Sequence, residues 1–440
     1  MYCNKSVLTV MVIAILSVIC VAQAQWLETT ITVGVKPFAL CYNSQNNKVY
    51  CANTNSNNVT VIDGATNQVI TTVVAGSRPQ ALCYNPANNK VYCANTAKLD
   101  EVGNVTVIDG ASNQVITTVV ADSSPQALCY NPANNKVYCA NTNSNNVTVI
   151  DGASNQVITT VVAGRYPCAL CYNPQNNKVY CANGYWDSVT VIDGASNQVI
   201  TTVVAGSEPC ALCYNPQNNK VYCANQHGNV TVIDGASNQV DTTVAAGSWP
   251  CALCYNPLNN KVYCANYGSN NVTVIDGATN QVIATVVAGS SPLTLCYNPA
   301  NNKIYCANYG SNNVTVIDGA SNQVLRTIGI GDNPCAFTWS PVQNRIYVAN
   351  YDSNTVSVIR DSVLGVAEKG RVSPVYTGPT VIHGILRLPI APTHSSVYLL
   401  DISGRRALRL HSDANDVSRL PPGIYFLEGE QESARKVIIE

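Results

Sequence analysis

The chain has 440 residues, of which 46% are hydrophobic and only 11% are charged, and its formal net charge is −1. This balance excludes a chain kept disordered by charge, because such chains are rich in charge and poor in apolar residues. It also excludes bulk electrostatic attachment to nucleic acid or to an acidic membrane, which needs a basic surplus. With 3 Phe against 24 Tyr, the composition is more typical of half-polar strands than of a helical core.

The first 24 residues have the pattern of a signal peptide. Lys5 supplies a basic start, residues 7–21 are apolar, and Ala22-Gln23-Ala24 is a cleavage signal ahead of Gln25. The apolar run is shorter than the ~20 residues that a membrane-spanning helix needs. We therefore predict cleavage after residue 24, export to the cell surface or the extracellular space, and no transmembrane segment in the mature chain.

Residues 25–360 are built from tandem repeats. Tyr-Cys-Ala-Asn recurs with its Tyr at Tyr50, Tyr92, Tyr138, Tyr180, Tyr222, Tyr263 and Tyr305, and Tyr347 opens an eighth copy as Tyr-Val-Ala-Asn. The spacings are 42, 46, 42, 42, 41, 42 and 42 residues. Periods of this length are typical of solenoids and propellers.

Each repeat contains four short apolar runs separated by turn residues. In the second repeat the runs are 80–84, 90–94, 104–108 and 114–121, and Asn-Pro and Asp-Gly turns separate them. Four strands rich in Val, Ile, Thr and Tyr every ~42 residues indicate a propeller blade. The first three strands occur eight times and the fourth occurs seven times after them, while residues 28–34 match the missing copy. We predict an all-β, eight-bladed propeller closed by the N-terminal strand, with a seven-bladed ring as the alternative.

The eighth repeat carries a family resemblance. Ile346-Tyr347-Val348-Ala349-Asn350, followed by Ser353-Asn354-Thr355-Val356 and preceded by Gly331-Asp332-Asn333-Pro334, resembles the YVTN β-propeller repeat of surface-layer-type extracellular proteins. The resemblance covers about three quarters of the chain. It implies a propeller fold but leaves function open, since similar propellers include binding scaffolds, lactonase-like hydrolases and redox-associated proteins.

Residues 361–440 form a separate predicted domain. They hold 18 charged residues in 80 positions, against 31 in the preceding 360, and no Cys occurs after Cys335. Short alternating runs such as 397–400 and 423–427 indicate a small β-sandwich. The stretches 401–406, 420–426 and 435–439 resemble the C-terminal sorting domain of type IX secretion substrates, which implies contact with that secretion machinery. The alternative is a β-sandwich appendage with no role in secretion.

Fourteen cysteines form seven pairs, each separated by ten residues on the first two strands of a repeat. A hairpin register that places the members of a pair opposite each other would bring them within reach of a disulfide. The alternative is that each Cys is a small apolar core residue. The candidate disulfides are Cys41/Cys51, Cys83/Cys93, Cys129/Cys139, Cys171/Cys181, Cys213/Cys223, Cys254/Cys264 and Cys296/Cys306.

The other cysteines do not predict a metal site. Cys168, Cys210 and Cys251 each stand three residues before a paired Cys, and on a strand such residues point to opposite faces. His227 is the single His of the repeat region, so a multi-His metal site cannot be built there. We predict no metal, no cofactor and no catalytic residue.

The repeats differ mainly in two loop classes, the one between strands two and three and the one joining consecutive repeats. In a propeller both classes emerge on the same face. Repeats four to six place there the aromatic and polar residues that are enriched at recognition hot spots. The predicted binding residues are Arg165, Tyr166, Tyr185, Trp186, Asp187, Glu208, His227, Trp249 and Tyr267.

These features favour an exported scaffold that recognises an extracellular protein or a glycan and is not a catalyst. The first alternative is a structural component of a surface coat, in which near-identical blades supply a rigid disc. The second is a lactonase-like or redox enzyme, for which no acid–base pair can be named among the repeats.

Overall fold

The computed structural model describes residues 23–97, 102–363, 380–382, 385–388, 397–400, 405–410, 413–417, 420–421, 423–429 and 432–439. Most of the predicted signal peptide and residues 401–404 of the sorting-domain resemblance lie outside the described residues. The chain divides into two compact units, Met1–Val366 and Ala367–Glu440.

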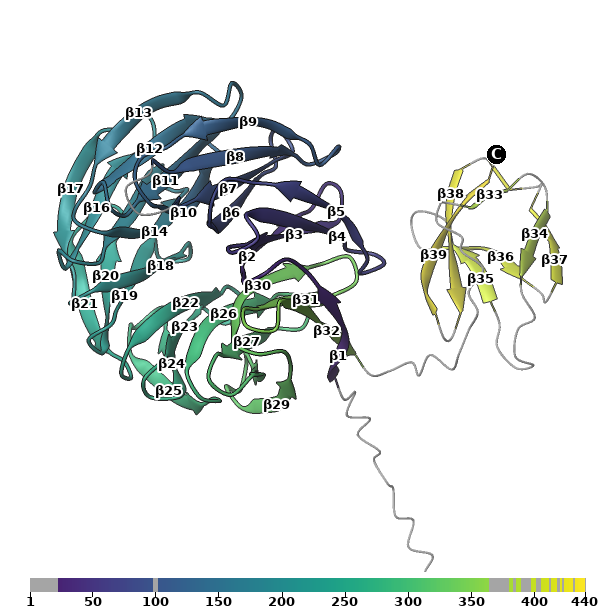
Figure 1. The fold of residues 1–440 in the computed structure, drawn as a ribbon. Coiled ribbons are helices and arrows are strands. Elements are labelled where there is room, and N and C mark those ends of the chain that lie inside the picture. The colour runs from purple at the N-terminus through teal and green to yellow at the C-terminus, as the bar shows by residue number, and fades with distance from the viewer. Residues whose placement is uncertain are drawn as a thin grey trace, which may run out of the picture. The chain divides into compact units, whose positions relative to one another are not determined.

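The first unit is a propeller of eight four-stranded blades whose strands pair antiparallel (Figure 1). Each blade runs from its first strand at the centre to its fourth at the rim. The strands of blades 1 to 4 are β2 (Pro37–Asn43), β3 (Lys48–Asn53), β4 (Asn58–Asp63), β5 (Val69–Val74); β6 (Pro79–Asn85), β7 (Lys90–Asn95), β8 (Asn104–Asp109), β9 (Val115–Val120); β10 (Pro125–Asn131), β11 (Lys136–Asn141), β12 (Asn146–Asp151), β13 (Val157–Val162); β14 (Pro167–Asn173), β15 (Lys178–Asn183), β16 (Ser188–Asp193), β17 (Val199–Val204). Those of blades 5 to 8 are β18 (Pro209–Asn215), β19 (Lys220–Asn225), β20 (Asn229–Asp234), β21 (Val240–Ala245); β22 (Pro250–Asn256), β23 (Lys261–Asn266), β24 (Asn271–Asp276), β25 (Val282–Val287); β26 (Pro292–Asn298), β27 (Lys303–Asn308), β28 (Asn313–Asp318), β29 (Val324–Gly329); β30 (Pro334–Ser340), β31 (Arg345–Asn350), β32 (Thr355–Val363) and β1 (Gln23–Thr32).

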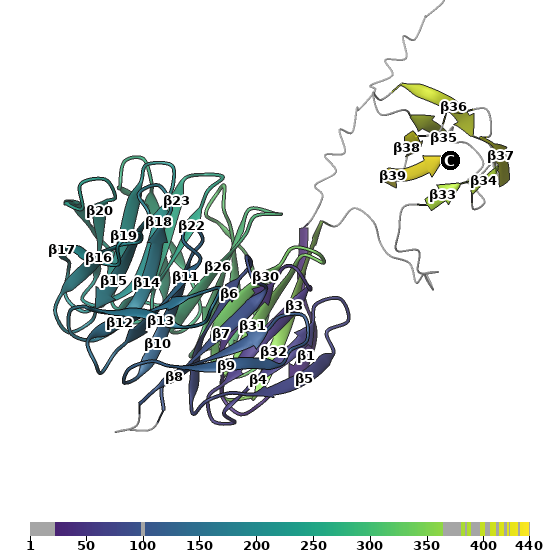
Figure 2. The ribbon, with the colours of Figure 1, turned by 90° about the horizontal axis from the view of Figure 1, so that it is seen from above.

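The N-terminal strand closes the ring. β1 pairs with β32 over Gln23 to Thr32 and supplies the outer strand of blade 8, as the sequence predicts (Figures 1 and 2). The Lys303 ammonium lies 2.7 Å from the Asp361 carboxylate, and both side chains are fully buried. Arg345 pairs with Glu28 of β1 at 2.6 Å. The predicted eight-bladed ring is confirmed, and the seven-bladed alternative is wrong.

Hydrophobic clusters fill the spaces between neighbouring blades. Tyr92, Val105 and Val107 of blade 2 pack against Cys139 and Ile150 of blade 3, and equivalent clusters join the other blades. The second and third strands are buried on both sides because each sheet lies between two others. This explains why their runs are apolar at successive positions.

Polar contacts at one face tie each blade to the next. The Tyr92 hydroxyl donates to Asn155 Oδ1 at 3.1 Å, and the Lys90 ammonium donates to the Gly152 carbonyl at 2.8 Å. Asn155 and Gly152 belong to the turn between the third and fourth strands of blade 3. We call this side of the disc, formed by the turns between strands one and two and between strands three and four, the latch face.

The predicted disulfides are absent, and the strand register explains why. All 18 cysteines from Cys41 to Cys335, which lie within the described residues, are free thiols. In blade 2, Cys83 lies opposite Tyr92, and Cys93 lies opposite Leu82. The turn between Asn85 and Lys90 holds four residues, so the register differs by one from the predicted register. Because a shift of one residue reverses the side-chain direction, the two thiols point to opposite faces of the sheet.

The same register holds in the other blades that carry a predicted pair, where the first Cys lies opposite a Tyr and the second opposite a Leu. The thiols therefore serve as the small apolar core residues of the alternative interpretation. The pairs so corrected are Cys41/Cys51, Cys83/Cys93, Cys129/Cys139, Cys171/Cys181, Cys213/Cys223, Cys254/Cys264 and Cys296/Cys306.

The second unit contains two small sheets among its described residues. One has the order β33 (Thr380–Ile382), β39 (Glu432–Ile439), β38 (Gly423–Gly429), β35 (Val397–Leu400), β36 (Arg406–Leu410), and the other pairs β34 (Ile385–Leu388) with β37 (Asp413–Asp416). Leu399, Leu410 and Val417 are buried in it. In the described part of the chain, no helix is long and apolar enough to cross a membrane.

Candidate binding site

The face opposite the latch face carries the two loop classes that vary among the repeats. We call it the variable face. It is formed by the loops between strands two and three, such as Gly184–Asp187, and by the loops joining consecutive blades, such as Gly164–Tyr166. All nine predicted binding residues lie in these loops.

The left-handed backbone positions of the latch face differ from those of the blade-joining loops on the variable face. The loops between strands two and three of the variable face hold Asn at five such positions, Asn57, Asn145, Asn270, Asn312 and Asn354. On the latch face, fifteen residues have positive φ, and every one is Asn: Asn47, Asn67, Asn89, Asn113, Asn135, Asn155, Asn177, Asn197, Asn219, Asn238, Asn260, Asn280, Asn302, Asn322 and Asn344. Asn tolerates this conformation better than other residues with a Cβ. The turn residues of the latch face are therefore those that the backbone conformation prefers.

On the variable face, each loop joining two blades has a positive φ at the residue before its Pro. These eight residues are Lys36, Arg78, Ser124, Tyr166, Glu208, Trp249, Ser291 and Asn333. Only the last is the residue that this conformation favours. Bulky side chains in a left-handed conformation are rare, and strained residues of this kind cluster at functional sites.

A continuous series of contacts runs across blades 4 to 6 on the variable face. The rings of Tyr166 and Tyr185 have centroids 4.4 Å apart and are tilted by 43°. Asp187 Oδ1 accepts a hydrogen bond from the backbone N–H of Glu208 at 3.0 Å. Nε2 of His227 lies 3.7 Å from Oε1 of Glu208.

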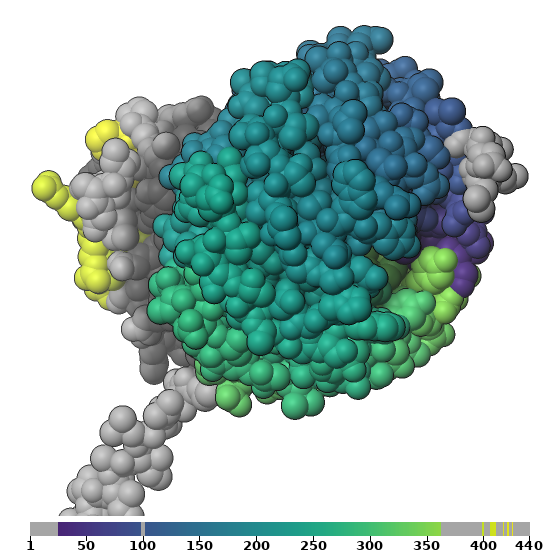
Figure 3. Space-filling model, turned by 90° about the vertical axis from the view of Figure 1, so that its left-hand side faces the viewer, coloured from purple at the N-terminus to yellow at the C-terminus, as the bar shows by residue number. Residues whose placement is uncertain are grey.

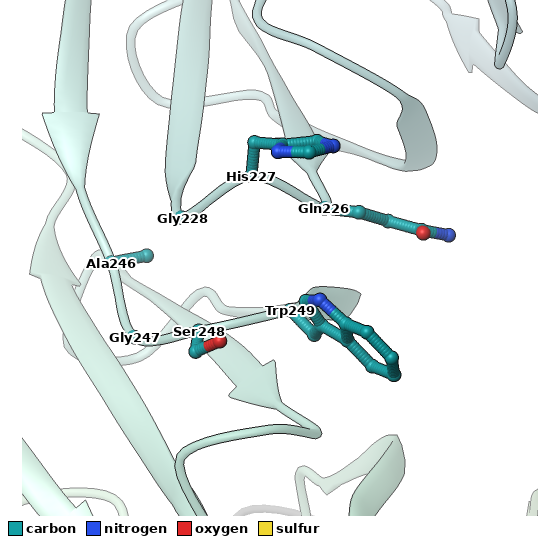
Figure 4. Close-up of a pocket in the computed structure, with 7 residues that line it drawn as sticks. All are labelled: Gln226, His227, Gly228, Ala246, Gly247, Ser248 and Trp249. Carbon is teal, nitrogen blue, oxygen red and sulfur yellow. The ribbon is translucent and has the colours of Figure 1, made fainter.

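The series continues into blade 6. His227 and Trp249 line one shallow depression together with Gln226, and Figure 4 shows the side chains of Gln226 and Trp249 projecting to the same side of their loops. The Trp249 and Tyr267 rings are stacked with centroids 6.0 Å apart. The structure thus places seven of the predicted residues in one patch.

The other two predicted residues extend this patch. Arg165 is exposed, and its backbone carbonyl accepts a hydrogen bond from the Tyr185 N–H at 3.2 Å. Trp186 stands at the tip of its loop and is 58% exposed, close to the 57% of Trp249.

A cavity of about 360 Å³ lies beside this patch. Tyr166, Tyr185 and Glu208 line it, as the patch predicts, but so do Gln126, Gln226, Cys168 and Cys210, which the sequence did not suggest as binding residues. Gln126, Cys168 and Cys210 each directly follow the Pro that opens the first strand of a blade. This shared position is the sequence signal that could have identified them.

The two thiols of the cavity are held as neutral donors. Cys168 Sγ lies 3.3 Å from the Pro209 carbonyl, and Cys210 Sγ lies 3.1 Å from the Pro250 carbonyl. Burial raises the pKa of Cys168 to about 11 and also raises the pKa of Cys210. Both thiols are therefore protonated at neutral pH, and in the described residues no group of three His, Cys, Asp or Glu side chains is arranged to hold a metal ion.

Comparisons with known proteins agree with the fold. The model of the YNCE-like beta-propeller family matches residues 4–158 and 101–385. The chain therefore belongs to the YNCE-like beta-propeller family. No curated protein matches the sequence.

Three solved structures share the architecture. The computationally designed Ika8 protein aligns at 19% identity over 76% of this chain and all of its own, with a TM-score of 0.63. Hydrazine synthase of Kuenenia stuttgartiensis aligns at 22% identity over 65% of this chain and 96% of its own, with a TM-score of 0.54. Sqt1 of Saccharomyces cerevisiae aligns at 12% identity over 77% of this chain and 99% of its own, with a TM-score of 0.68. At these identities the likeness is one of fold alone.

Proposed function

We propose that this protein is an exported propeller that acts at the cell surface or outside the cell as a recognition scaffold for a protein or a glycan. The observation that carries this proposal is the contrast in left-handed positions. Asn occupies all of them on the latch face, whereas seven of the eight before a Pro on the variable face are other residues. Such a position costs a residue other than Gly or Asn about 1–2 kcal/mol.

Exposed aromatic side chains support the same role. Tyr185 is 62% exposed, and Trp186 and Trp249 are exposed to a similar extent. Tyr and Trp present large, stiff contact surfaces with few torsions to fix, which makes them effective in recognition. The neutral, buried thiols of the neighbouring cavity do not favour nucleophilic catalysis, which requires a thiolate. We therefore favour a binding function over a lactonase-like or redox activity.

Export is supported by the sequence of residues 1–24 and by the resemblance of residues 361–440 to a type IX sorting domain. The test is the intact mass and N-terminal sequence of the protein recovered from the medium or cell surface of its host. We expect the chain to begin at Gln25, and a shortened C-terminus would indicate that the sorting-like domain is removed. Full-length chain confined to the cytoplasm would contradict the proposal.

Recognition is tested with the full chain on a glycan array and by photo-crosslinking on intact cells. A photo-reactive residue in place of Tyr185 should capture a surface protein or glycoconjugate, whereas the same residue in place of Leu258, an exposed residue in a latch-face turn, should not. The double variant Trp186→Ala/Trp249→Ala should lose binding with little change in Tm, because exposed side chains contribute little to stability. Equal capture from both faces, or a sharp fall in Tm, would contradict the proposal.

A structural role in a surface coat is the second candidate, and the rim of the disc favours it. The outer strands expose apolar side chains in repeated positions, including Ile158, Val162 and Val204, the last two being 77% and 76% exposed. Figure 3 views the propeller from the side on which β17 and β21 form the rim in Figure 1. Outer strands such as β13 and β17 are end strands of their sheets, and exposed apolar edges promote association. Electron microscopy of the full chain at rising concentration would show ordered sheets if the rim assembles, and Ile158→Thr/Val162→Thr should weaken them.

A further inference from the structure

We propose that the cavity of the variable face between blades 4 and 5 binds a neutral saccharide unit. This inference rests on the proposed recognition function and specifies its ligand. The cavity volume of about 360 Å³ lies in the range of small-molecule sites. It suits one or two sugar rings of a longer chain better than an extended protein surface.

One wall of the cavity is aromatic. Tyr166 and Tyr185 come from different loops, and their tilted rings both line the cavity. The Tyr166 backbone is held at φ 62°, and its carbonyl accepts a hydrogen bond from the Gly184 N–H at 2.8 Å. A pair of rings fixed in this way offers apolar faces against which the C–H groups of a sugar ring can stack.

The remaining walls carry groups that bind hydroxyls. Gln126 Oε1 accepts a hydrogen bond from the Thr142 hydroxyl at 2.8 Å, which orients its amide nitrogen as a donor. Gln226 adds a second amide, and the Glu208 carboxylate adds an acceptor. An amide both donates and accepts, as does each hydroxyl of a sugar, so this set matches a polyol.

The charge of the cavity disfavours an ionic ligand. No Lys or Arg lines it, so an anionic ligand would find no counter-charge. Its single carboxylate, on Glu208, is 43% exposed and lies 3.7 Å from the His227 ring. A cationic peptide would therefore meet one solvent-screened charge that already has a neighbour, which contributes little to binding.

Blade 3 supplies a natural control. In the places of Tyr166 and Tyr185 it has Ser124 and Asn143, and the Asn143 amide donates to the Ser124 hydroxyl at 2.8 Å. The substitutions Tyr166→Ser and Tyr185→Asn therefore introduce residues that the fold already accepts at these positions. They remove the aromatic wall and leave the hydroxyl-binding groups in place.

The test is saturation-transfer NMR and calorimetry of the full chain with maltotriose, cellotriose and tri-N-acetylchitotriose. A heparin tetrasaccharide and trilysine serve as the anionic and cationic probes. We expect at least one neutral trisaccharide to bind and the two charged probes not to bind. The Tyr166→Ser/Tyr185→Asn variant should weaken saccharide binding at least tenfold, whereas Leu258→Ser, on the latch face, should leave it unchanged.

Preference for trilysine or heparin, or equal saccharide binding by wild type and the double Tyr variant, would overturn the saccharide assignment. If no trisaccharide binds while a photo-reactive residue at position 185 still captures a surface protein, the saccharide assignment is wrong and the recognition face stands. If neither occurs, both proposals are wrong.

Discussion

The two faces of the propeller are built from the same repeat, yet they differ in what their turns tolerate. On the latch face each turn uses Asn where the backbone is left-handed, and Tyr and Lys side chains tie that turn to the preceding blade. In the loops that join blades on the variable face, the left-handed positions carry residues such as Tyr166, Glu208 and Trp249, whereas the loops between strands two and three hold Asn at five of theirs. The comparison indicates that the latch face is arranged for stability, whereas the variable face displays side chains at the expense of stability.

The comparison assumes that side-chain packing and the polar contacts of the latch face, and not disulfides, hold the blades together. Burial raises the pKa of each of the fourteen repeated thiols above its usual range. A thiol whose pKa is higher in the folded protein than in the unfolded chain contributes its full stabilisation below the pKa of the unfolded chain. This contribution is lost as the pH rises from there toward the pKa of the folded state. Above the pKa of the unfolded chain, each thiol lowers the free energy of unfolding by about 1.4 kcal/mol per pH unit.

We therefore expect the purified protein to unfold cooperatively between about pH 9 and pH 10. Over this range the summed loss from the fourteen thiols exceeds the ~5–15 kcal/mol free energy of unfolding of a typical domain. Circular dichroism against pH measures this, with thiol titration in denaturant as the control. An unchanged signal at pH 10 together with the absence of titratable thiols would show that disulfides form after all.

The substitution Asn89→Ala tests the latch face. Asn89 has φ 50°, and its Oδ1 accepts hydrogen bonds from Asn43 Nδ2 at 2.9 Å and from the Tyr84 hydroxyl at 3.3 Å. We expect a loss of about 2–3 kcal/mol from backbone strain and unpaired polar groups. Ser124→Ala at a left-handed position of the variable face should change stability by less than about 0.5 kcal/mol. Chemical denaturation measures both variants, and equal effects would remove the distinction between the faces.

The Asp residues of the latch-face turns should give a smaller, acid-dependent effect. Hydrogen bonds from the backbone N–H and the hydroxyl of Ser112 hold the pKa of Asp109 below its usual range, and Ser154 does the same for Asp151. Because these pKa values are lowered on folding, their contribution is present above about pH 4 and is lost as pH falls through the folded values. Tm should decline between pH 4 and pH 2, and variants with Asp109→Asn and Asp151→Asn should decline less steeply.

The fold could be predicted well from the sequence because the same pattern of four apolar runs and intervening turn residues recurs in every repeat. Residues 90–94 and 104–108 were predicted as strands and are contained in β7 and β8. The ring closure followed from one unmatched strand at the N-terminus. The strand register at the cysteines could not be predicted in this way, because it depends on the number of residues in the turn between Asn85 and Lys90. A difference of one residue in that turn changes the face of the sheet to which a side chain points.

The candidate site was predictable only in part. Loop variation located Tyr166, Tyr185 and Glu208 because aromatic and charged residues stand out against the repeated background. Gln126 and Cys210 lie at strand starts, where nothing in a single repeat distinguishes a cavity-lining residue from a packing residue. Only the placement of neighbouring blades side by side brings them to one cavity.

The most direct test of the central claim is a triple variant, Tyr166→Asn/Glu208→Asn/Trp249→Asn, measured for both Tm and binding. Each substitution restores the residue that the left-handed backbone prefers, at positions with φ 62°, 55° and 56°. We expect the free energy of unfolding to rise by about 1 kcal/mol for each position, and Tm to rise with it. Binding to the captured partner should be lost. A lower Tm with binding retained would contradict the claim that this face carries strained residues for recognition.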